Sequence, residues 1–135
     1  MDEKKKKILC VDDNTNLCRT LSLVLKRKGY DVEMAKDGRE ALEKWKGSDF
    51  EMTLLDIKLP GPNGVETLKK IKEMKKDARV IMMTAYAIDD MVSEAIDSGA
   101  EGVFYKPMDM DEVISKIEKD NGVDESPENK EEVIV

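Results

Sequence analysis

Short apolar runs that alternate with longer amphipathic segments constrain this chain more than any other feature of its sequence. Five runs rich in Val, Ile, Leu and Met are each followed by a segment whose apolar residues recur at helical spacing. The runs cover residues 8–11, 32–35, 52–55, 80–83 and 103–105, and Gly, Asp and Asn residues separate them from the amphipathic segments. This alternation predicts five βα units.

Helical connections between consecutive strands call for a parallel sheet that is covered on both faces, with right-handed crossovers. We therefore expect an α/β fold, a doubly wound (βα)5 sandwich. The chain has 135 residues, which is too short for a closed eight-fold barrel. The third helix is expected to bury Val65, Leu68, Ile71 and Met74, and Asp109 with Glu112 predicts a capping box for the last helix.

The domain organisation follows from length and charge. A chain of this size can form one domain with a core that needs no disulfide or metal. We place this domain at residues 1–120. Residues 121–135 hold five acidic residues and one Lys, which predicts an acidic, disordered tail. The tail also resembles a linker, so an N-terminal fragment of a larger regulator remains an alternative.

Composition excludes several classes of function. The formal net charge is −7, and the lysines at 69, 70, 72, 75 and 76 are interspersed with acids, so we expect no nucleic-acid partner. Histidine is absent, which excludes sites that depend on imidazole. Cys10 and Cys18 are interpreted as free thiols in a reducing compartment. No apolar run is long enough to span a membrane, so we predict a cytoplasmic protein without a membrane partner.

The residues that end the predicted strands carry the chemistry. Asp12 and Asp13 follow the first strand and Asp56 follows the third. Thr84 follows the fourth, and Lys106 with Pro107 follows the fifth. Ligands of open α/β sheets bind outside the carboxyl ends of the strands. We therefore expect three carboxylates, a hydroxyl and an ammonium group to meet at one edge.

Three neighbouring carboxylates repel one another unless a cation neutralises them. Oxygen ligands without His or Cys favour Mg²⁺, or Mn²⁺ in its place. A carboxylate beside such an ion can attack phosphorus and form an acyl phosphate, while a lysine neutralises charge on the phosphoryl oxygens. Asp56, alone at the end of the central strand, is the best candidate for the nucleophile.

Four separated motifs carry a family resemblance. They are Ile-Leu-Cys-Val-Asp-Asp-Asn at 8–14, Leu-Leu-Asp-Ile-Lys-Leu-Pro-Gly at 54–61, Met-Thr-Ala-Tyr at 83–86 and Lys-Pro at 106–107. In order and spacing the chain resembles the receiver (response-regulator) domain of two-component signal transduction, of the single-domain type found in chemotaxis and sporulation relays. The resemblance covers residues 6–119. It implies a flavodoxin-like fold with sheet order 2-1-3-4-5.

The resemblance also implies roles for individual residues. Asp56 would be the phosphoacceptor, and Thr84 and Lys106 would contact the phosphoryl group. Mg²⁺ would be held by Asp13, Asp56 and the backbone carbonyl of Lys58, with Asp12 in the outer shell. The Lys106–Pro107 peptide bond would be cis. Such a protein is a phosphoacceptor that catalyses its own phosphotransfer and dephosphorylation, and it is not an enzyme acting on a separate substrate.

Three positions bear on switching and phosphoryl lifetime. Val103 stands where receivers carry a switch aromatic, three residues before the lysine, which leaves that coupling open. Lys58 and Tyr86 occupy the two positions with which the family sets the lifetime of the acyl phosphate. Both side chains are large, so the hypothesis is that they hinder attack by water.

The resemblance implies a sensor histidine kinase or a histidine phosphotransfer protein as phosphoryl donor. It also implies a downstream protein partner on the face formed by the fourth helix, fifth strand and fifth helix, which would include Met91, Ala95, Val103, Tyr105 and Val113. Two alternatives remain beside a phosphorylated receiver. One is a receiver-like interaction domain that works without phosphorylation, and the other is a Mg²⁺-dependent phosphohydrolase, disfavoured by Lys58 at the position where that class needs an acid.

Overall fold

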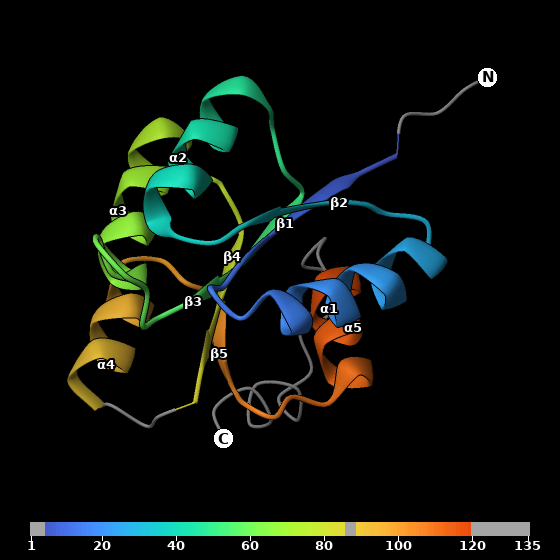
Figure 1. Ribbon diagram of the computed structural model, residues 1–135. Helices are drawn as coiled ribbons and strands as arrows, with labels where there is room; N and C mark the ends of the chain where they lie inside the picture. The colour runs from blue at the N-terminus through green and yellow to red at the C-terminus, as the bar shows by residue number, and fades with distance from the viewer. Residues whose placement is uncertain (1–4, 86–88, 120–135) are drawn as a thin grey trace.

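A computed structural model describes residues 5–85 and 89–119, and these form a parallel sheet between two layers of helices (Figure 1). The strands pair in the order β2-β1-β3-β4-β5, as the resemblance implies. Their bounds are β1 Lys7–Val11, β2 Asp31–Ala35, β3 Met52–Asp56, β4 Val80–Thr84 and β5 Gly102–Tyr105. The predicted doubly wound α/β sandwich is confirmed.

Each strand is followed by a helix. The bounds are α1 Thr15–Arg27, α2 Gly38–Gly47, α3 Gly64–Met74, α4 Asp89–Asp97 and α5 Met110–Glu118. Helices α1 and α5 cover one face of the sheet, and α2, α3 and α4 cover the other (Figure 1). The predicted strands therefore lie where the apolar runs indicated, and the start predicted for the fourth helix, Ile88, lies outside the described residues.

The burial of the strands explains their composition. Every residue of β3 and β4 is buried, because both strands lie inside the sheet with helices on each side. The edge strand β2 contains buried Ala35 but also exposed Asp31 and Met34. Two separate apolar cores result. One lies under α2, α3 and α4 and includes Leu55 and Leu68, and the other lies under α1 and α5 and includes Leu21 and Leu54.

Caps at the helix starts account for several polar residues. Asn63 and Glu66 form a complete capping box at α3, in which each side chain accepts from the other residue's backbone N–H. The capping box predicted at Asp109 is wrong, because the Asp109 side chain accepts from the N–H of Asp111 instead. Glu112 bonds to Asp109 through the backbone.

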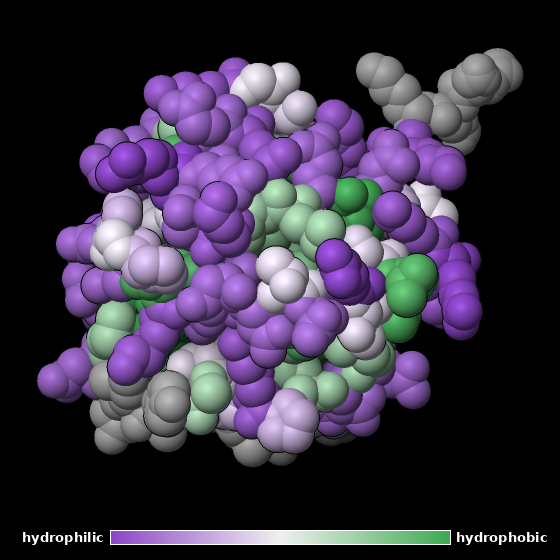
Figure 2. Space-filling model, viewed as in Figure 1, coloured by the Kyte–Doolittle hydropathy of each residue, from purple (hydrophilic) through white to green (hydrophobic). Residues whose placement is uncertain are grey.

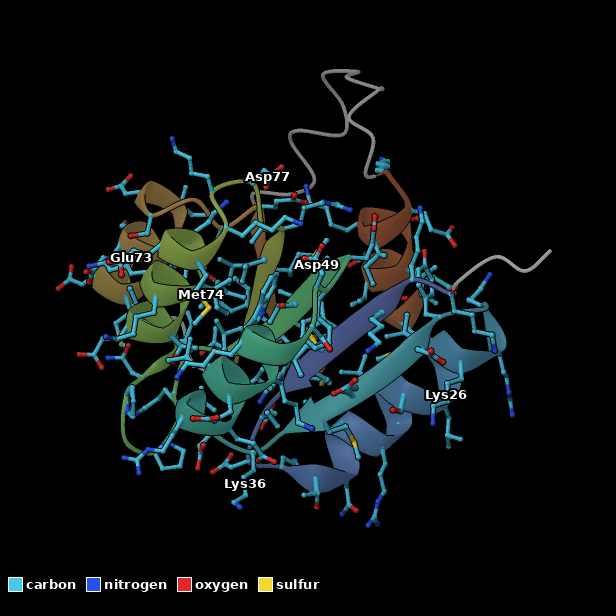
Figure 3. The ribbon with its side chains drawn as sticks, turned by 90° about the horizontal axis from the view of Figure 1, so that it is seen from above. Lys26, Lys36, Asp49, Glu73, Met74 and Asp77 are labelled. Atoms are coloured by element: carbon cyan, nitrogen blue, oxygen red, sulfur yellow. The ribbon has the colours of Figure 1, made fainter. Side chains whose placement is uncertain are left out.

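Two lysines, one on α3 and one just after it, lie at the surface and pair with acidic residues. Lys69 pairs with Glu94 on α4, and Lys75 pairs with Asp49. Met74 was expected in the core, yet it is 43% exposed as the last residue of α3. Figure 3 shows Glu73 and Met74 at α3, in the helical layer formed by α2, α3 and α4. The face of the molecule drawn in Figure 2 is mainly hydrophilic, with apolar residues in small separate areas.

Within the described ranges, the structure contains no helix that is both long and apolar enough to cross a membrane.

Candidate functional site

The carboxyl ends of the strands bring the predicted site residues together. Asp12 directly follows β1, and Asp56 is the last residue of β3. One carboxylate oxygen from each of Asp12, Asp13 and Asp56 lies within 4.8 Å of the others. Asp12 and Asp56 are buried, whereas Asp13 is exposed. The sequence therefore located an acidic cluster correctly at this edge.

A single ammonium group joins two of these carboxylates. The Nζ of Lys106, which directly follows β5, lies 2.6 Å from Oδ2 of Asp12 and 3.3 Å from Oδ2 of Asp56. Burial lowers the pKa of Lys106, but the hydrogen bond with Asp12 and the charges of Asp56 and Asp12 outweigh it. The pKa of Lys106 therefore lies above its ordinary value, and this residue is charged at neutral pH.

Asp56 is held in an environment that opposes its ionisation. Only 5% of the residue is exposed. Burial, followed by repulsion from the charge of Asp12, raises the pKa of Asp56 to about 6, against the opposing effects of Lys106 and the N–H of Lys58. At neutral pH the carboxylate is still mostly ionised. It is a more basic nucleophile than an ordinary Asp, which favours attack on an electrophile.

Backbone N–H groups orient both buried carboxylates. Oδ1 of Asp12 accepts from the N–H of Asn14 at 2.9 Å, and the Asn14 side chain in turn caps α1. Oδ1 of Asp56 accepts from the N–H of Lys58 at 3.2 Å. Each carboxylate thus uses one oxygen for the loop that follows its strand and directs the other toward Lys106. The orientation leaves Asp13 as the carboxylate most open to solvent.

Gly64 is a positioning residue that the sequence alone did not single out. It begins α3, and its N–H donates to the carbonyl of Ile57 at 2.8 Å. A Cβ at this position would lie 2.1 Å from the backbone oxygen of Asp56. Only glycine permits this approach of α3 to the end of β3. The signal in the sequence was a Gly at a helix start, which by itself does not reveal the contact.

The oxygen donors at this edge fit a divalent hard cation. Three carboxylates supply oxygen ligands, one of them exposed, and Lys106 neutralises only part of their charge. Histidine is absent from the chain, and the two cysteines are buried in the core under α1 and α5. Mg²⁺ prefers such oxygen ligands and keeps several waters, so the donor set matches it better than zinc.

The remaining predicted residues are placed as follows. Thr84 is fully buried at the end of β4, and its carbonyl accepts from the N–H of Lys106 at 2.8 Å. The Lys106–Pro107 peptide bond is cis, which confirms that expectation. Val103 is half-buried against the core under α2, α3 and α4, and Lys58 is exposed. Tyr86 lies outside the described residues.

The expected partner face needs a correction. Ala95 and Val113 were counted among its residues, but they are 0% and 1% exposed and belong to the two cores. Both positions lie on the inner sides of amphipathic helices, so they pack against the sheet. Met91 and Val103 are half-buried, and Tyr105 is 40% exposed.

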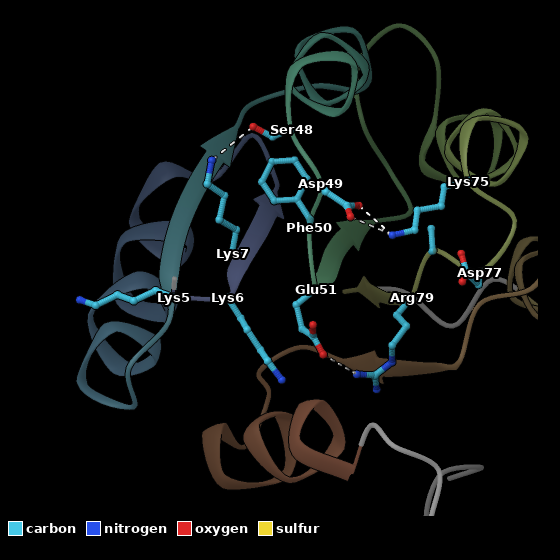
Figure 4. Close-up of a pocket in the computed structure, with 11 residues that line it drawn as sticks. Lys5, Lys6, Lys7, Ser48, Asp49, Phe50, Glu51, Lys75, Asp77 and Arg79 are labelled. Carbon is cyan, nitrogen blue, oxygen red and sulfur yellow. Dashed lines mark hydrogen bonds and ion pairs between the residues drawn. The ribbon is translucent and has the colours of Figure 1, made fainter. Parts of the chain in front are cut away.

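A separate hollow opens at the opposite edge of the sheet, where the strands begin (Figure 4). Its lining carries both signs of charge. Both carboxylate oxygens of Asp49 lie 2.9 Å from Nζ of Lys75, and Arg79 lies 3.8 Å from Glu51. This hollow is remote from the acidic cluster, so it contributes no group to that site.

Known proteins resemble this chain over the same region. A family model described as the response regulator receiver domain matches residues 8–118. Sporulation initiation phosphotransferase F of Bacillus subtilis is 39% identical over 113 residues, which cover 84% of this chain and 91% of that protein. The transcriptional regulatory protein ZraR of Klebsiella oxytoca is 41% identical over 106 residues. This chain spans 24% of that longer regulator.

Solved structures agree with this result. A CheY-like response regulator receiver domain protein from Methanospirillum hungatei has a TM-score of 0.83 and 33% identity, covering 86% of this chain and 93% of that one. The CheX-CheY-BeF3-Mg²⁺ complex from Borrelia burgdorferi has a TM-score of 0.79 and 30% identity, covering 88% and 90%. The flavodoxin-like arrangement of the chain is thus shared with proteins of similar sequence.

Proposed function

This chain belongs to the response regulator receiver domain family of two-component signalling, and we propose that Asp56 is its phosphoacceptor. The observation that carries the proposal is the buried Asp56 carboxylate, which lies 3.3 Å from Lys106 within a cluster of three aspartates. A phosphorylation site needs a nucleophile, a charge-neutralising cation and an open edge for the donor. Asp56 and Lys106 meet at the carboxyl edge of the sheet, where Asp13 is exposed to solvent.

The proposed reaction is phosphoryl transfer. Oδ2 of Asp56 attacks the phosphorus of a phosphohistidine, the P–N bond breaks, and the imidazole leaves with its electron pair and takes up a proton. Lys106, which bridges Asp12 and Asp56, donates to a phosphoryl oxygen. The Thr84 hydroxyl contacts another phosphoryl oxygen. In this way the protein catalyses its own phosphorylation. It also catalyses the later hydrolysis of the acyl phosphate on Asp56.

Mg²⁺ is the proposed cofactor, with Mn²⁺ as a substitute. Asp13, Asp56 and the backbone carbonyl of Lys58 would hold it, and Asp12 would lie in the outer shell. When bound, the ion supplies positive charge that stabilises the equatorial oxygens of the transferred group. The 4.8 Å cluster of carboxylate oxygens supports this assignment. The exposed Asp13 gives an ion access from solvent.

The proposed phosphoryl donor and downstream partner rest on the family to which the chain belongs. We propose a sensor histidine kinase or histidine phosphotransfer protein as donor, and a protein partner on the α4, β5 and α5 face as output. Among relatives, the CheY of Borrelia burgdorferi is found in a complex with CheX, which supports protein docking as the output. We assign the domain to residues 1–120, the acidic tail to residues 121–135 and the protein to the cytoplasm.

Lys58 and Tyr86 are proposed to set the lifetime of the phosphoryl group. Lys58 lies two residues after Asp56, and its N–H is already bonded to Oδ1 of that residue. A long side chain at this position obstructs the line along which water attacks phosphorus. Replacing Tyr86 with Ala should speed hydrolysis of the acyl phosphate, and an unchanged decay rate would contradict the proposed role.

The proposal is tested with acetyl phosphate, Mg²⁺ and intact mass spectrometry. We expect one phosphoryl adduct on the wild-type protein, no adduct on Asp56→Asn, and no adduct after chelation of the metal. Asp49→Asn is a matched control, because Asp49 is an exposed aspartate at the opposite edge. If folded protein with bound Mg²⁺ forms no adduct, the receiver works as an interaction domain without phosphorylation.

A further inference from the structure

Two cysteine thiols lie in contact next to the acidic cluster. Cys10 is in β1, two residues before Asp12, and Cys18 is the fourth residue of α1. Their sulfur atoms are 3.1 Å apart, although the residues are separated by eight positions in the sequence. The chain contains no third cysteine. Any disulfide within one molecule would therefore join this pair.

The surroundings hold both sulfurs in place. Cys10 and Cys18 are 0% and 1% exposed, in the core that α1 and α5 cover. Sγ of Cys18 also points to the backbone oxygens of Cys10 at 3.7 Å and Asp12 at 3.9 Å. A disulfide bond is about 2.05 Å long, so the two sulfurs need to approach by only about 1 Å.

We propose that Cys10 and Cys18 are a redox modification site, at which the folded domain forms a reversible intramolecular disulfide. With hydrogen peroxide, both thiols lose their protons, one S–S bond forms, and two electrons reduce the peroxide to two molecules of water. With oxidised glutathione, thiol–disulfide exchange forms the same bond and releases two molecules of reduced glutathione.

The disulfide would close a covalent ring around the loop between β1 and α1. Asp12, Asp13 and Asn14 all lie between the two cysteines. In the reduced protein the N–H of Asn14 donates to Oδ1 of Asp12 within this loop, and the two thiols are in contact. Oxidation replaces the thiol contact with a bond and ties the acidic loop to the core. Oxidation of the two cysteines would therefore constrain the segment that carries Asp12 and Asp13 of the acidic cluster.

Oxidation of buried thiols is slow, so the test measures the equilibrium constant for disulfide formation and not its rate. The contact with Cys18 and burial raise the pKa of Cys10 well above its ordinary value, so little thiolate is present at neutral pH. Small oxidants reach such buried sulfurs only when the structure around them opens locally. The equilibrium constant for oxidation, in contrast to its rate, depends only on how well the folded state accommodates the bond.

The experiment compares native and urea-unfolded protein in glutathione redox buffers. Thiols are trapped with N-ethylmaleimide, and intact mass distinguishes the reduced protein, mixed disulfides and the internal disulfide. We expect the equilibrium constant for the internal disulfide to be about tenfold or more higher in native protein, because the fold already places the sulfurs together. A constant no higher than in urea would overturn the proposal, as would disulfides formed only between molecules.

A second measurement does not depend on access of the oxidant. The disulfide is formed in urea, the oxidised monomer is purified, and its refolding and urea midpoint are compared with those of the reduced protein. We expect the oxidised form to refold with a higher midpoint, which dithiothreitol returns to the reduced value. Failure to refold, or a lower midpoint, would overturn the proposal. Cys18→Ser, which retains one thiol, corrects for mixed disulfides, and no phosphoryl donor is needed.

Discussion

Replacing Asp56 with Asn should stabilise the folded protein at neutral pH. The wild-type carboxylate is buried beside Asp12. Burial and the negative charge of Asp12 both oppose its ionisation in the folded state. Asn has nearly the same shape and carries no charge. Its side-chain oxygen can still accept from the N–H of Lys58, and Lys106 keeps its 2.6 Å contact with Asp12. The substitution therefore removes the unfavourable charge and little else.

The magnitude follows from the pKa. In the folded protein the pKa of Asp56 rises from 3.8 to about 6. This difference of about 2 in pKa corresponds to ~3 kcal/mol of folding free energy lost when the group is ionised. Asn does not recover all of it, because Lys106 loses one of its two carboxylate contacts. We expect a gain of about 1–3 kcal/mol above pH 7.

The sign of the pH dependence is fixed by the direction of the shift. The folded protein binds a proton on Asp56 more readily than the unfolded chain does. The destabilisation is therefore absent below about pH 4, grows between pH 4 and 6, and is complete above that range. The advantage of Asp56→Asn should accordingly be largest at about pH 7.5 and should shrink as the pH falls toward 4.

Urea unfolding of metal-free protein measures this effect. Trp45 is the only tryptophan and is 6% exposed, so its fluorescence reports on the core. A higher midpoint with an unchanged slope would show a change in stability alone. Asp49→Asn is the control and should change stability by less than about 1 kcal/mol, because Asp49 is an exposed partner of Lys75. Added Mg²⁺ should stabilise wild type more than Asp56→Asn.

Two results would refute this reasoning. If Asp56→Asn is no more stable than wild type at pH 7.5, burial and the charge of Asp12 do not act on Asp56 as the structure indicates. If its advantage increases toward acid pH, the shift has the opposite direction.

Three further substitutions test other contacts. Gly64→Ala should lower the free energy of unfolding by about 1–3 kcal/mol or more, because the new Cβ meets the backbone oxygen of Asp56. Its control is Gly47→Ala, whose Cβ meets no atom within 4 Å and which should be nearly neutral in urea unfolding. Arg79→Met should lower the free energy of unfolding by about 1.5–3 kcal/mol, because Arg79 donates twice to Glu101 and also to carbonyl oxygens of α5. Its control is Lys75→Met, which loses only the surface pair with Asp49. Lys106→Met should lower the yield of the acetyl phosphate adduct while Mg²⁺ binding is retained, and an unchanged yield would contradict the proposed role of Lys106.

Much of the site could be predicted because parallel strands place their carboxyl ends at one edge. Asp12, Asp56 and Lys106 each stand at the end of a strand, and the apolar runs located those ends. Sequence alone could not show that Lys106 lies nearer to Asp12 than to Asp56, because side-chain packing determines which carboxylate it reaches. The same limit applies to Gly64, whose contact with Asp56 depends on how α3 approaches β3.

The errors in the predicted fold also have physical reasons. The resemblance placed Ala95 and Val113 on the partner face, but it did not show which side of each amphipathic helix packs on the sheet. The structure places both residues in the cores. Helical periodicity extended to Met74, where the helix ends and the side chain is exposed. Local capping at Asp109 was decided by geometry that a residue pattern does not fix.

The contact between Lys106 and the two aspartates also has a consequence for synthesis. Lys106 lies 94 residues after Asp12 and 50 after Asp56. A chain still emerging from the ribosome therefore exposes both carboxylates well before the residue that neutralises them has been added. The central strands cannot reach their final electrostatic balance until β5 has joined the edge of the sheet. Neutralisation of Asp12 and Asp56 by Lys106 is thus a late event in the synthesis of the chain, and it follows the addition of the last strand of the sheet.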